Sequence, residues 1–314
     1  MSPNGIKIEN EDEKTFCKLC LEELSAEEIE EMEEMHDQVH RTCKEEFDEY
    51  TWKNFQTTEE RKKLINWLSK IGYFKKINID LYSIDQKLQH ILTTNSINLA
   101  GLNINDIPIE IGSLTNVEQL YLDNNAIRKL PDELGKLKYL MVLSLSYNNL
   151  HEIPECIGKI YALEFLYLNR NFIDTGLEHI IELKNLKKLK LGQNLITEIP
   201  KEMLNLPNLI ELDLYQNKIQ ELPKELGLLR SLRTLELHCN NIPNIPETIG
   251  QLSNLEHLNL SSNNITTVPA KLLLLTKLNF LDLSYNNFTQ AIFGIASLHL
   301  NEYIINYKPE PELA

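Results

Sequence analysis

Apolar residues recur at a fixed spacing between Leu114 and Ser297. Eight successive segments of 23 residues follow the pattern L-x-x-L-x-x-L-x-L-x-x-N-x-L/I-x-x-L/I-P, and the copy LKYLMVLSLSYNNLHEIPECIGK begins at Leu137. A fixed period of this length indicates one supersecondary unit that is stacked many times. One position holds asparagine in all eight copies: Asn125, Asn148, Asn171, Asn194, Asn217, Asn240, Asn263 and Asn286.

Each copy predicts a short strand followed by a turn. Apolar and polar residues alternate around Leu120 and Leu122 and their counterparts, as in a strand with one buried face. One copy cannot bury its own leucines, so the copies are expected to stack into a parallel sheet. The asparagine follows the strand, where its amide can satisfy backbone groups of adjacent turns. Prolines on the other side of the unit oppose regular helix there: Pro108, Pro131, Pro154, Pro200, Pro223, Pro246 and Pro269.

These copies resemble the leucine-rich repeat family. The resemblance implies an α/β fold, a solenoid with a curved parallel sheet on its concave side and turns or 3₁₀ pieces on its convex side. Copies in which IP or LP precedes E-L/I-G are similar to the Ras-group-related leucine-rich repeat proteins, whose relatives bind small GTPases or phosphatase catalytic subunits. The resemblance implies a protein-binding scaffold and does not identify the partner.

Segments on both sides of the repeats are expected to cap the solenoid, because its apolar ends must be covered. Helical spacing of apolar residues in EERKKLINWLSKI and SIDQKLQHILTT predicts two capping helices, with a free-standing helical domain as the alternative. Leu102 replaces the asparagine in a degenerate first copy. The expected organisation is a disordered acidic leader at 1–14, a zinc finger with an acidic helix at 15–50, a helical cap at 51–90, nine repeats at 91–297, and a C-terminal cap and tail at 298–314.

Cysteine and histidine residues near the start have the spacing of a metal site. A Cys-x-x-Cys pair is followed by a His-x-x-Cys pair, and His36 is an alternative imidazole ligand. The arrangement resembles the first half of a LIM-type or treble-clef finger, but a second ligand set does not follow. Buried or surface thiols beside an acidic helix are the alternative. We expect one structural zinc ion bound to Cys17, Cys20, His40 and Cys43.

Charge is concentrated at the same end of the chain. Of a formal net charge of −15, residues 1–50 carry −12, with 17 acidic and 5 basic side chains. This balance argues against nucleic acid or an anionic membrane as the main partner. The polar first residues and the odd number of cysteines, five in all, favour a reducing interior. We therefore expect a cytoplasmic monomer.

Sequence motifs of common enzymes are missing. The chain has no P-loop, GxSxG or HExxH motif, so we expect no catalytic activity. His238 and His257 share the strand face of adjacent copies. This pair is interpreted either as a metal or catalytic site or as two polar residues on a wet surface.

The positions that alternate with the buried leucines predict a binding surface. Several aromatic residues and an arginine fall on neighbouring strands, and Lys187, Lys188 and Lys190 form a basic strip next to them. Asp213, Glu236 and Asp282 form an acidic stretch beyond. Exposed aromatic and arginine side chains are typical of interaction hot spots, although single exposed aromatics are common and carry no meaning. The expected contact residues are Tyr121, Tyr147, Phe165, Tyr167, Arg170, Lys188, Lys190 and Tyr215.

The sequence thus favours a non-catalytic scaffold that binds a protein on the concave face. A substrate-recruiting component of a ubiquitin-ligase-like system, with the N-terminal finger as recruiting module, is the alternative. One expected zinc ion argues against it, because RING modules need two. A purely structural role in a larger assembly is a third possibility.

Overall fold

The computed structural model describes residues 58–80, 82–288, 298, 300 and 302–304. The chain divides into two units, Met1–Gln56 and Thr57–Ala314. The first unit, and with it the expected leader and finger, lies outside the described residues. Among the described helices, none is long and apolar enough to cross a membrane.

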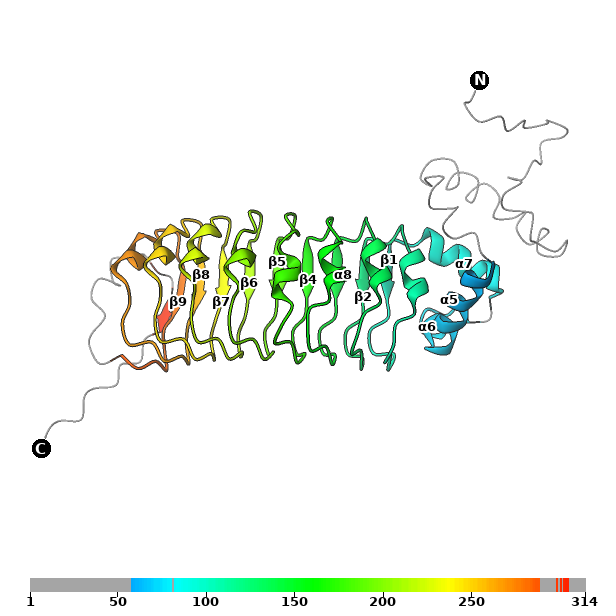
Figure 1. The fold of residues 1–314 in the computed structure, drawn as a ribbon, viewed down its shortest axis with the longest axis horizontal. Coiled ribbons are helices and arrows are strands. Elements are labelled where there is room, and N and C mark those ends of the chain that lie inside the picture. The colour runs from blue at the N-terminus through cyan, green and yellow to red at the C-terminus, as the bar shows by residue number, and fades with distance from the viewer. Residues whose placement is uncertain (1–57, 81, 289–297, 299, 301, 305–314) are drawn as a thin grey trace, which may run out of the picture. The chain divides into compact units, whose positions relative to one another are not determined.

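Three helices stand at the N-terminal end of the second unit (Figure 1): α5 (Thr58–Lys70), α6 (Tyr73–Lys76) and α7 (Ile84–Thr93). Leu64, Leu68 and Phe74 are fully buried in this helical end. Ser83 begins α7 with a reciprocal capping box, in which its hydroxyl accepts from the Gln86 amide and its own amide donates to the Gln86 side chain. The helix ends at Thr93, inside the range expected for the first repeat.

A parallel sheet of ten strands follows, with the strands in sequence order. Each register step from β1 to β9 is 23 residues, so equivalent positions of successive copies form straight ladders. The predicted solenoid fold is therefore confirmed. The strands are β1 (Ser96–Asn98), β2 (Gln119–Tyr121), β3 (Val142–Ser144), β4 (Phe165–Tyr167), β5 (Lys188–Lys190), β6 (Glu211–Asp213), β7 (Thr234–Glu236), β8 (His257–Asn259), β9 (Phe280–Asp282) and β10 (Glu302–Ile304).

Short helices form the convex side opposite the sheet (Figure 1). Proline precedes all of them except η4, and its carbonyl accepts the first turn's hydrogen bond, as from the Ile249 amide to Pro246 at 3.0 Å. Gly176 precedes η4 instead, with φ at +87°. The convex elements are η2 (Ile109–Ser113), η3 (Asp132–Lys136), α8 (Glu155–Gly158), η4 (Leu177–Ile180), η5 (Lys201–Leu204), η6 (Lys224–Leu228), η7 (Glu247–Gln251) and η8 (Ala270–Leu274).

The repeated asparagine links each copy to the preceding one, as predicted. The Asn240 Oδ1 accepts from the Ile219 amide at 3.0 Å, and its Nδ2 donates to the carbonyls of Leu214 and Leu237, each at 3.0 Å. Seven of the eight asparagines are almost completely buried. Each amide thus satisfies backbone groups that would otherwise be unpaired inside the solenoid.

A second column of polar side chains crosses the turns before the strands. Asn185, Asn208 and Asn254 each donate from Nδ2 to the carbonyl of the residue 24 positions earlier, at 2.8–2.9 Å. Ser231 makes the same contact through its hydroxyl. The sequence pattern did not reveal this column, because its residue type changes from copy to copy.

A lysine of α6 contacts the open edge of the sheet at its N-terminal end. The Lys76 ammonium donates to the Asn98 side chain at 3.0 Å and to the Ala100 carbonyl at 2.8 Å. It therefore pairs with backbone and side-chain oxygens that no preceding strand can reach. At the other end, β10 pairs with β9 at an offset of 22 residues, since Glu302 lies opposite Phe280.

Candidate functional site

The ladders bring three of the predicted aromatic residues onto one surface. Tyr121 pairs with Ser144 and Ser144 pairs with Tyr167, so the two tyrosines lie two strands apart. Phe165 lies at the other end of β4, opposite Val142. The three aromatic side chains are partly exposed, whereas Ser144 is buried. The structure therefore places Tyr121, Phe165 and Tyr167 on one face, and the binding role of that face stays a prediction.

Tyr147 and Arg170 occupy the position just before the repeated asparagine. Both have left-handed backbone angles, with φ at +59° and +56°. The Arg170 guanidinium lies 4.7 Å from the centroid of the Tyr147 ring, a cation–π geometry, and the Tyr147 side chain is 47% exposed. This pair extends the aromatic surface beyond the ends of β3 and β4. We call Tyr121, Tyr147, Phe165, Tyr167 and Arg170 the aromatic patch.

The lysines beside the aromatic patch are not a free basic strip. Lys188 and Lys190 both reach the Glu211 carboxylate, at 2.9 and 2.7 Å, and Lys187 pairs with Glu164 at 2.7 Å. Burial alone would raise the pKa of Glu211, but the hydrogen bonds from Lys190 and Lys188 outweigh it and lower this pKa. All three lysines of the strip expected from the sequence are therefore paired, with two carboxylates of adjacent copies.

Tyr215 does not belong to the aromatic patch but to a second group of planar side chains. Its hydroxyl donates to the Gln193 side chain at 2.9 Å, and its ring stacks on His238 with centroids 4.9 Å apart. A Cβ on Gly192 would lie 2.1 Å from this ring, so only glycine fits below it. Glycine at position 192, next to Tyr215 in the 23-residue register, is the feature of the sequence that indicates where the Tyr215 ring lies.

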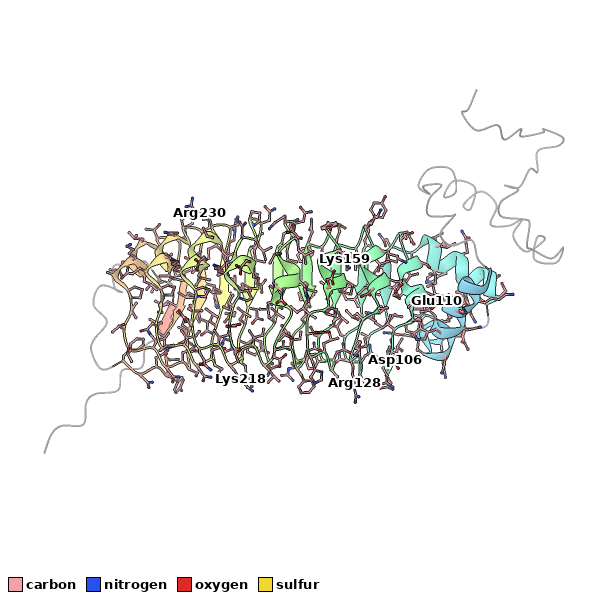
Figure 2. All side chains as sticks on the ribbon, in the orientation of Figure 1. Asp106, Glu110, Arg128, Lys159, Lys218 and Arg230 are labelled. Atoms are coloured by element: carbon pink, nitrogen blue, oxygen red, sulfur yellow. The ribbon has the colours of Figure 1, made fainter. Side chains whose placement is uncertain are left out.

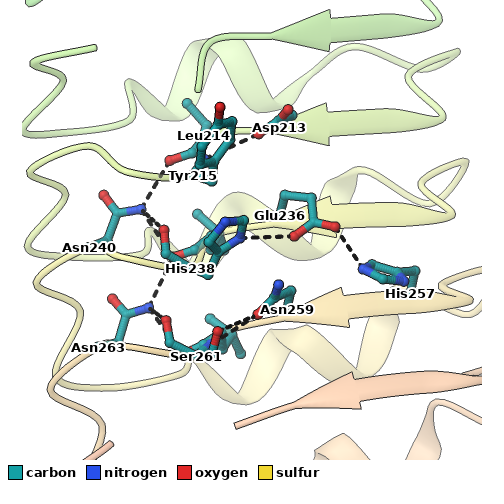
Figure 3. Close-up of polar contacts among 12 residues, drawn as sticks. Asp213, Leu214, Tyr215, Glu236, His238, Asn240, His257, Asn259, Ser261 and Asn263 are labelled. Atoms are coloured by element: carbon teal, nitrogen blue, oxygen red, sulfur yellow. Dashed lines mark hydrogen bonds and ion pairs between the residues drawn. The ribbon is translucent and has the colours of Figure 1, made fainter. Parts of the chain in front are cut away.

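Glu236 lies between the two histidines that the sequence placed on adjacent copies (Figure 3). One of its carboxylate oxygens is 3.1 Å from the His238 Nδ1 and the other is 2.7 Å from the His257 Nε2. Burial would raise the pKa of Glu236, but these two contacts overcome it and lower the pKa to about 2. The His257 ring stacks on Phe280 at a centroid distance of 4.2 Å. We call Tyr215, Glu236, His238, His257 and Phe280 the imidazole cluster.

The metal interpretation of the two histidines gains no support from this geometry. Across the described part of the chain, no three histidine, cysteine, aspartate or glutamate side chains are grouped so that they could hold a metal ion. The predicted zinc ligands lie outside the described residues: Cys17, Cys20, His40 and Cys43, and the alternative ligand His36.

Comparison with known families agrees with this architecture. The Leucine rich repeat family matches residues 115–173, 184–242 and 230–288, just over half of the chain. The chain belongs to the leucine-rich repeat family. Repeat domains of this kind present an extended concave surface to their partners and are generally non-catalytic.

Several solved leucine-rich repeat structures are similar to this chain. A leucine-rich repeat protein of Leptospira interrogans is 33% identical, with a TM-score of 0.65 over 74% of this chain and 60% of that chain. The ectodomain of a plant membrane receptor kinase from Arabidopsis thaliana, in complex with Casparian strip integrity factor 2, is 35% identical, with a TM-score of 0.55 over 59% of this chain and 23% of that chain.

An internalin C2 of Listeria monocytogenes is 27% identical, with a TM-score of 0.56 over 60% of this chain and 80% of that chain. This leucine-rich repeat chain spans 60% of the length of the Leptospira protein. Among curated proteins, none matches it significantly.

Proposed function

We propose that this protein is a non-catalytic scaffold that binds a protein partner on the concave face of its repeats. The observation that carries this proposal is the aromatic patch. Three of its rings lie partly exposed on the sheet, and Tyr147 and Arg170 project beside them. Tyrosine and arginine side chains are enriched among the few residues that carry most of the binding energy of protein interfaces.

The backbone below the patch favours tight binding because it is already ordered. Asn148 and Asn171 each connect two copies by hydrogen bonds from buried amides. Val142, Leu143 and Ser144 pair in register with both neighbouring strands. A surface that is rigid before binding loses less conformational entropy on association than a flexible loop does.

Charged side chains elsewhere on the unit are arranged as on an ordinary solvated surface (Figure 2). Arg230 projects at one long edge, and Arg128 and Lys218 project at the opposite edge. On the convex side, the exposed Lys159 pairs with Glu155 one helical turn away, at 2.9 Å. Within the described residues, the arginine that lies over an aromatic ring is Arg170, over Tyr147.

The partner class that we propose is an intracellular signalling protein such as a small GTPase or a phosphatase catalytic subunit. The similarity of the copies to Ras-group-related leucine-rich repeats supports this class. A cytoplasmic location is part of the same proposal. The similar plant receptor ectodomain has been solved in complex with Casparian strip integrity factor 2, which supports partner binding by this type of domain more generally.

Affinity enrichment with matched variants tests the proposal. Full-length wild-type protein, Phe165→Ala/Tyr167→Ala and Tyr139→Ala/Tyr161→Ala are each used to enrich partners from an extract of the source organism. Tyr139 and Tyr161 are 60% and 63% exposed, but they lie in turns outside the strands. The two variants therefore remove the same kind of exposed surface from different places.

We expect one partner that is retained by wild type and by the Tyr139/Tyr161 variant and is lost with the Phe165/Tyr167 variant. Circular dichroism and thermal unfolding establish that both variants are folded. A partner retained equally by all three proteins would place recognition outside the aromatic patch and contradict the proposal.

A further inference from the structure

The concave face changes its charge along the solenoid. The positions of β6 to β9 that alternate with the buried leucines, and the two positions that follow each strand, include no lysine or arginine. They include four carboxylates, of which only Glu211 is paired with lysines. The others are Asp213, Glu236 and Asp282. This half of the face therefore has a negative potential, whereas the aromatic patch carries Arg170.

The negative charges of Asp213 and Asp282 are not required by the backbone that they support. Each Oδ1 accepts from the amide two residues later, that of Tyr215 at 3.2 Å and that of Ser284 at 2.8 Å. Asn259 occupies the same ladder on β8, and its Oδ1 makes the same contact at 3.1 Å. An asparagine side chain thus makes the same backbone contact as an aspartate. The local backbone therefore does not explain why positions 213 and 282 carry a negative charge.

The charge on Asp213 is unfavourable for folding. The side chain is only 5% exposed, and none of the described lysine or arginine side chains lies within ion-pair distance of it. Burial raises its pKa, because the charged form loses hydration that the backbone hydrogen bond from Tyr215 and the Lys190 ammonium on the adjacent strand do not replace. A cation brought by a partner would restore that lost interaction.

Planar side chains lie next to these carboxylates. Glu236 lies between His238 and His257 (Figure 3), and these two rings stack on Tyr215 and Phe280 respectively. A guanidinium group combines charge with a flat face, so it pairs with carboxylates and stacks on aromatic rings at the same time. The imidazole cluster and Asp213 together fit such a group better than they fit a neutral side chain.

We propose that β6 and β7 bind an arginine or lysine side chain of the same partner segment whose apolar residue packs on Phe165 and Tyr167. This inference rests on the proposed function and specifies the chemistry of the partner. The occupant is an extended segment of a protein, with an apolar anchor and a basic residue.

The spacing of the strands fixes the spacing of those two residues. Adjacent strands are about 4.8 Å apart, so β4 is about 10 Å from β6 and about 14 Å from β7. An extended chain advances about 3.3 Å per residue. A segment that crosses the strands therefore places its basic residue three or four positions from its apolar anchor.

Peptide selection on the full-length protein tests this pattern. A displayed library of random twelve-residue peptides is selected against immobilised wild-type protein. Enriched peptides are synthesised with a fluorophore, and their dissociation constants are measured by fluorescence anisotropy. A second version of each peptide carries glutamine in place of its arginine or lysine.

Two protein variants test whether Asp213 contacts the basic residue of the peptide. Asp213→Asn removes one negative charge but keeps the oxygen that accepts from the Tyr215 amide. Asp106→Asn removes the same charge from an edge of the solenoid, outside the concave face (Figure 2). We expect Asp213→Asn to weaken the basic peptide about tenfold and Asp106→Asn to leave it unchanged. The glutamine peptide should bind wild type and Asp213→Asn equally.

Equal binding of the basic peptide to wild type and to folded Asp213→Asn would overturn the inference. So would a selection that enriches no peptide, or peptides without a basic residue at this spacing. The proposed function fails separately, if the enriched peptides bind Phe165→Ala/Tyr167→Ala as tightly as they bind wild type.

Discussion

Single buried amide and carboxylate side chains influence the stability of this solenoid. Asn240 is 6% exposed and uses its amide on three backbone groups of two copies at 3.0 Å. Its neighbour Asn241 is exposed and has no side-chain hydrogen bond to a described residue. Two asparagines that are adjacent in sequence therefore have opposite roles, which allows a matched comparison.

Replacing Asn240 by alanine should lower the free energy of unfolding by about 1–3 kcal/mol, because buried backbone groups lose their partners. Asn241→Ala should change it by less than about 0.5 kcal/mol. Urea denaturation followed by circular dichroism measures both. Equal midpoints for the two variants would show that the asparagine column does not hold the copies together.

The free energy of unfolding should depend on pH through the carboxyl group of Glu236. Its pKa is lowered from 4.5 to about 2, so its contribution to stability is complete above pH 4.5 and is lost as the pH falls through the folded value of about 2. The stability lost between these two pH values should be smaller in Glu236→Gln than in wild type. Denaturant unfolding across this window provides the measurement. The exposed Glu198→Gln is the control, and a wild-type-like pH profile for Glu236→Gln would contradict the assignment.

At this scale, the sequence predicted residues whose role repeats in every copy. The asparagine column has a constant phase, so the period alone identifies it. The pairing of Lys188 and Lys190 with Glu211 was missed, although the 23-residue register places Glu211 opposite Lys188. The sequence interpretation grouped charges along a strand, whereas charges on a sheet pair across strands. The bridging of two histidines by Glu236 depends on side-chain conformations that a period does not specify.

Among the elements, the repeats were more predictable than the ends. Strand positions follow from the alternation of leucines, and the proline before every convex element except η4 predicts a short piece rather than a long helix. The two ends of the solenoid have no repeated pattern from which their elements could be predicted. Nothing in the pattern predicts the 22-residue offset of β10, or that a lysine of α6 covers the edge of β1.

Lys76 should therefore contribute to the stability of the N-terminal end. Lys76→Met removes contacts of 2.8 and 3.0 Å to Ala100 and Asn98, and we expect faster amide exchange in β1 and α7. Because the ammonium is exposed, the loss in global stability should stay below about 1 kcal/mol. Lys75→Met, on the same helix, removes the same charge without these contacts. Identical exchange rates in the two variants, measured by mass spectrometry, would contradict the capping role.

The N-terminal finger remains a prediction from the sequence. Purified protein should carry one zinc ion per chain, because thiolates at this spacing bind zinc tightly near neutral pH. Elemental analysis should find no zinc after Cys17→Ser/Cys20→Ser. Zinc should be retained after Cys156→Ser/Cys239→Ser, since Cys156 is buried and Cys239 lies in a different copy. A zinc-free wild-type sample, prepared without chelators, would contradict the predicted zinc site.

For the whole molecule, the repeats provide one preformed surface with an aromatic half and an acidic half. The leucine pattern predicted that surface and its aromatic residues, because exposed positions are those that alternate with buried ones. It did not predict which charges remain available to a partner. Glu211 neutralises part of the basic strip, whereas Asp213 forms no ion pair with a described lysine or arginine.

We propose that a partner binds this protein through the aromatic patch. The most direct measurement is a calorimetric titration of the purified partner into wild type, Phe165→Ala/Tyr167→Ala and Tyr139→Ala/Tyr161→Ala. The loss of two central rings should weaken binding by at least about tenfold, whereas the turn variant should bind like wild type. Wild-type affinity in a folded Phe165→Ala/Tyr167→Ala protein would contradict the account.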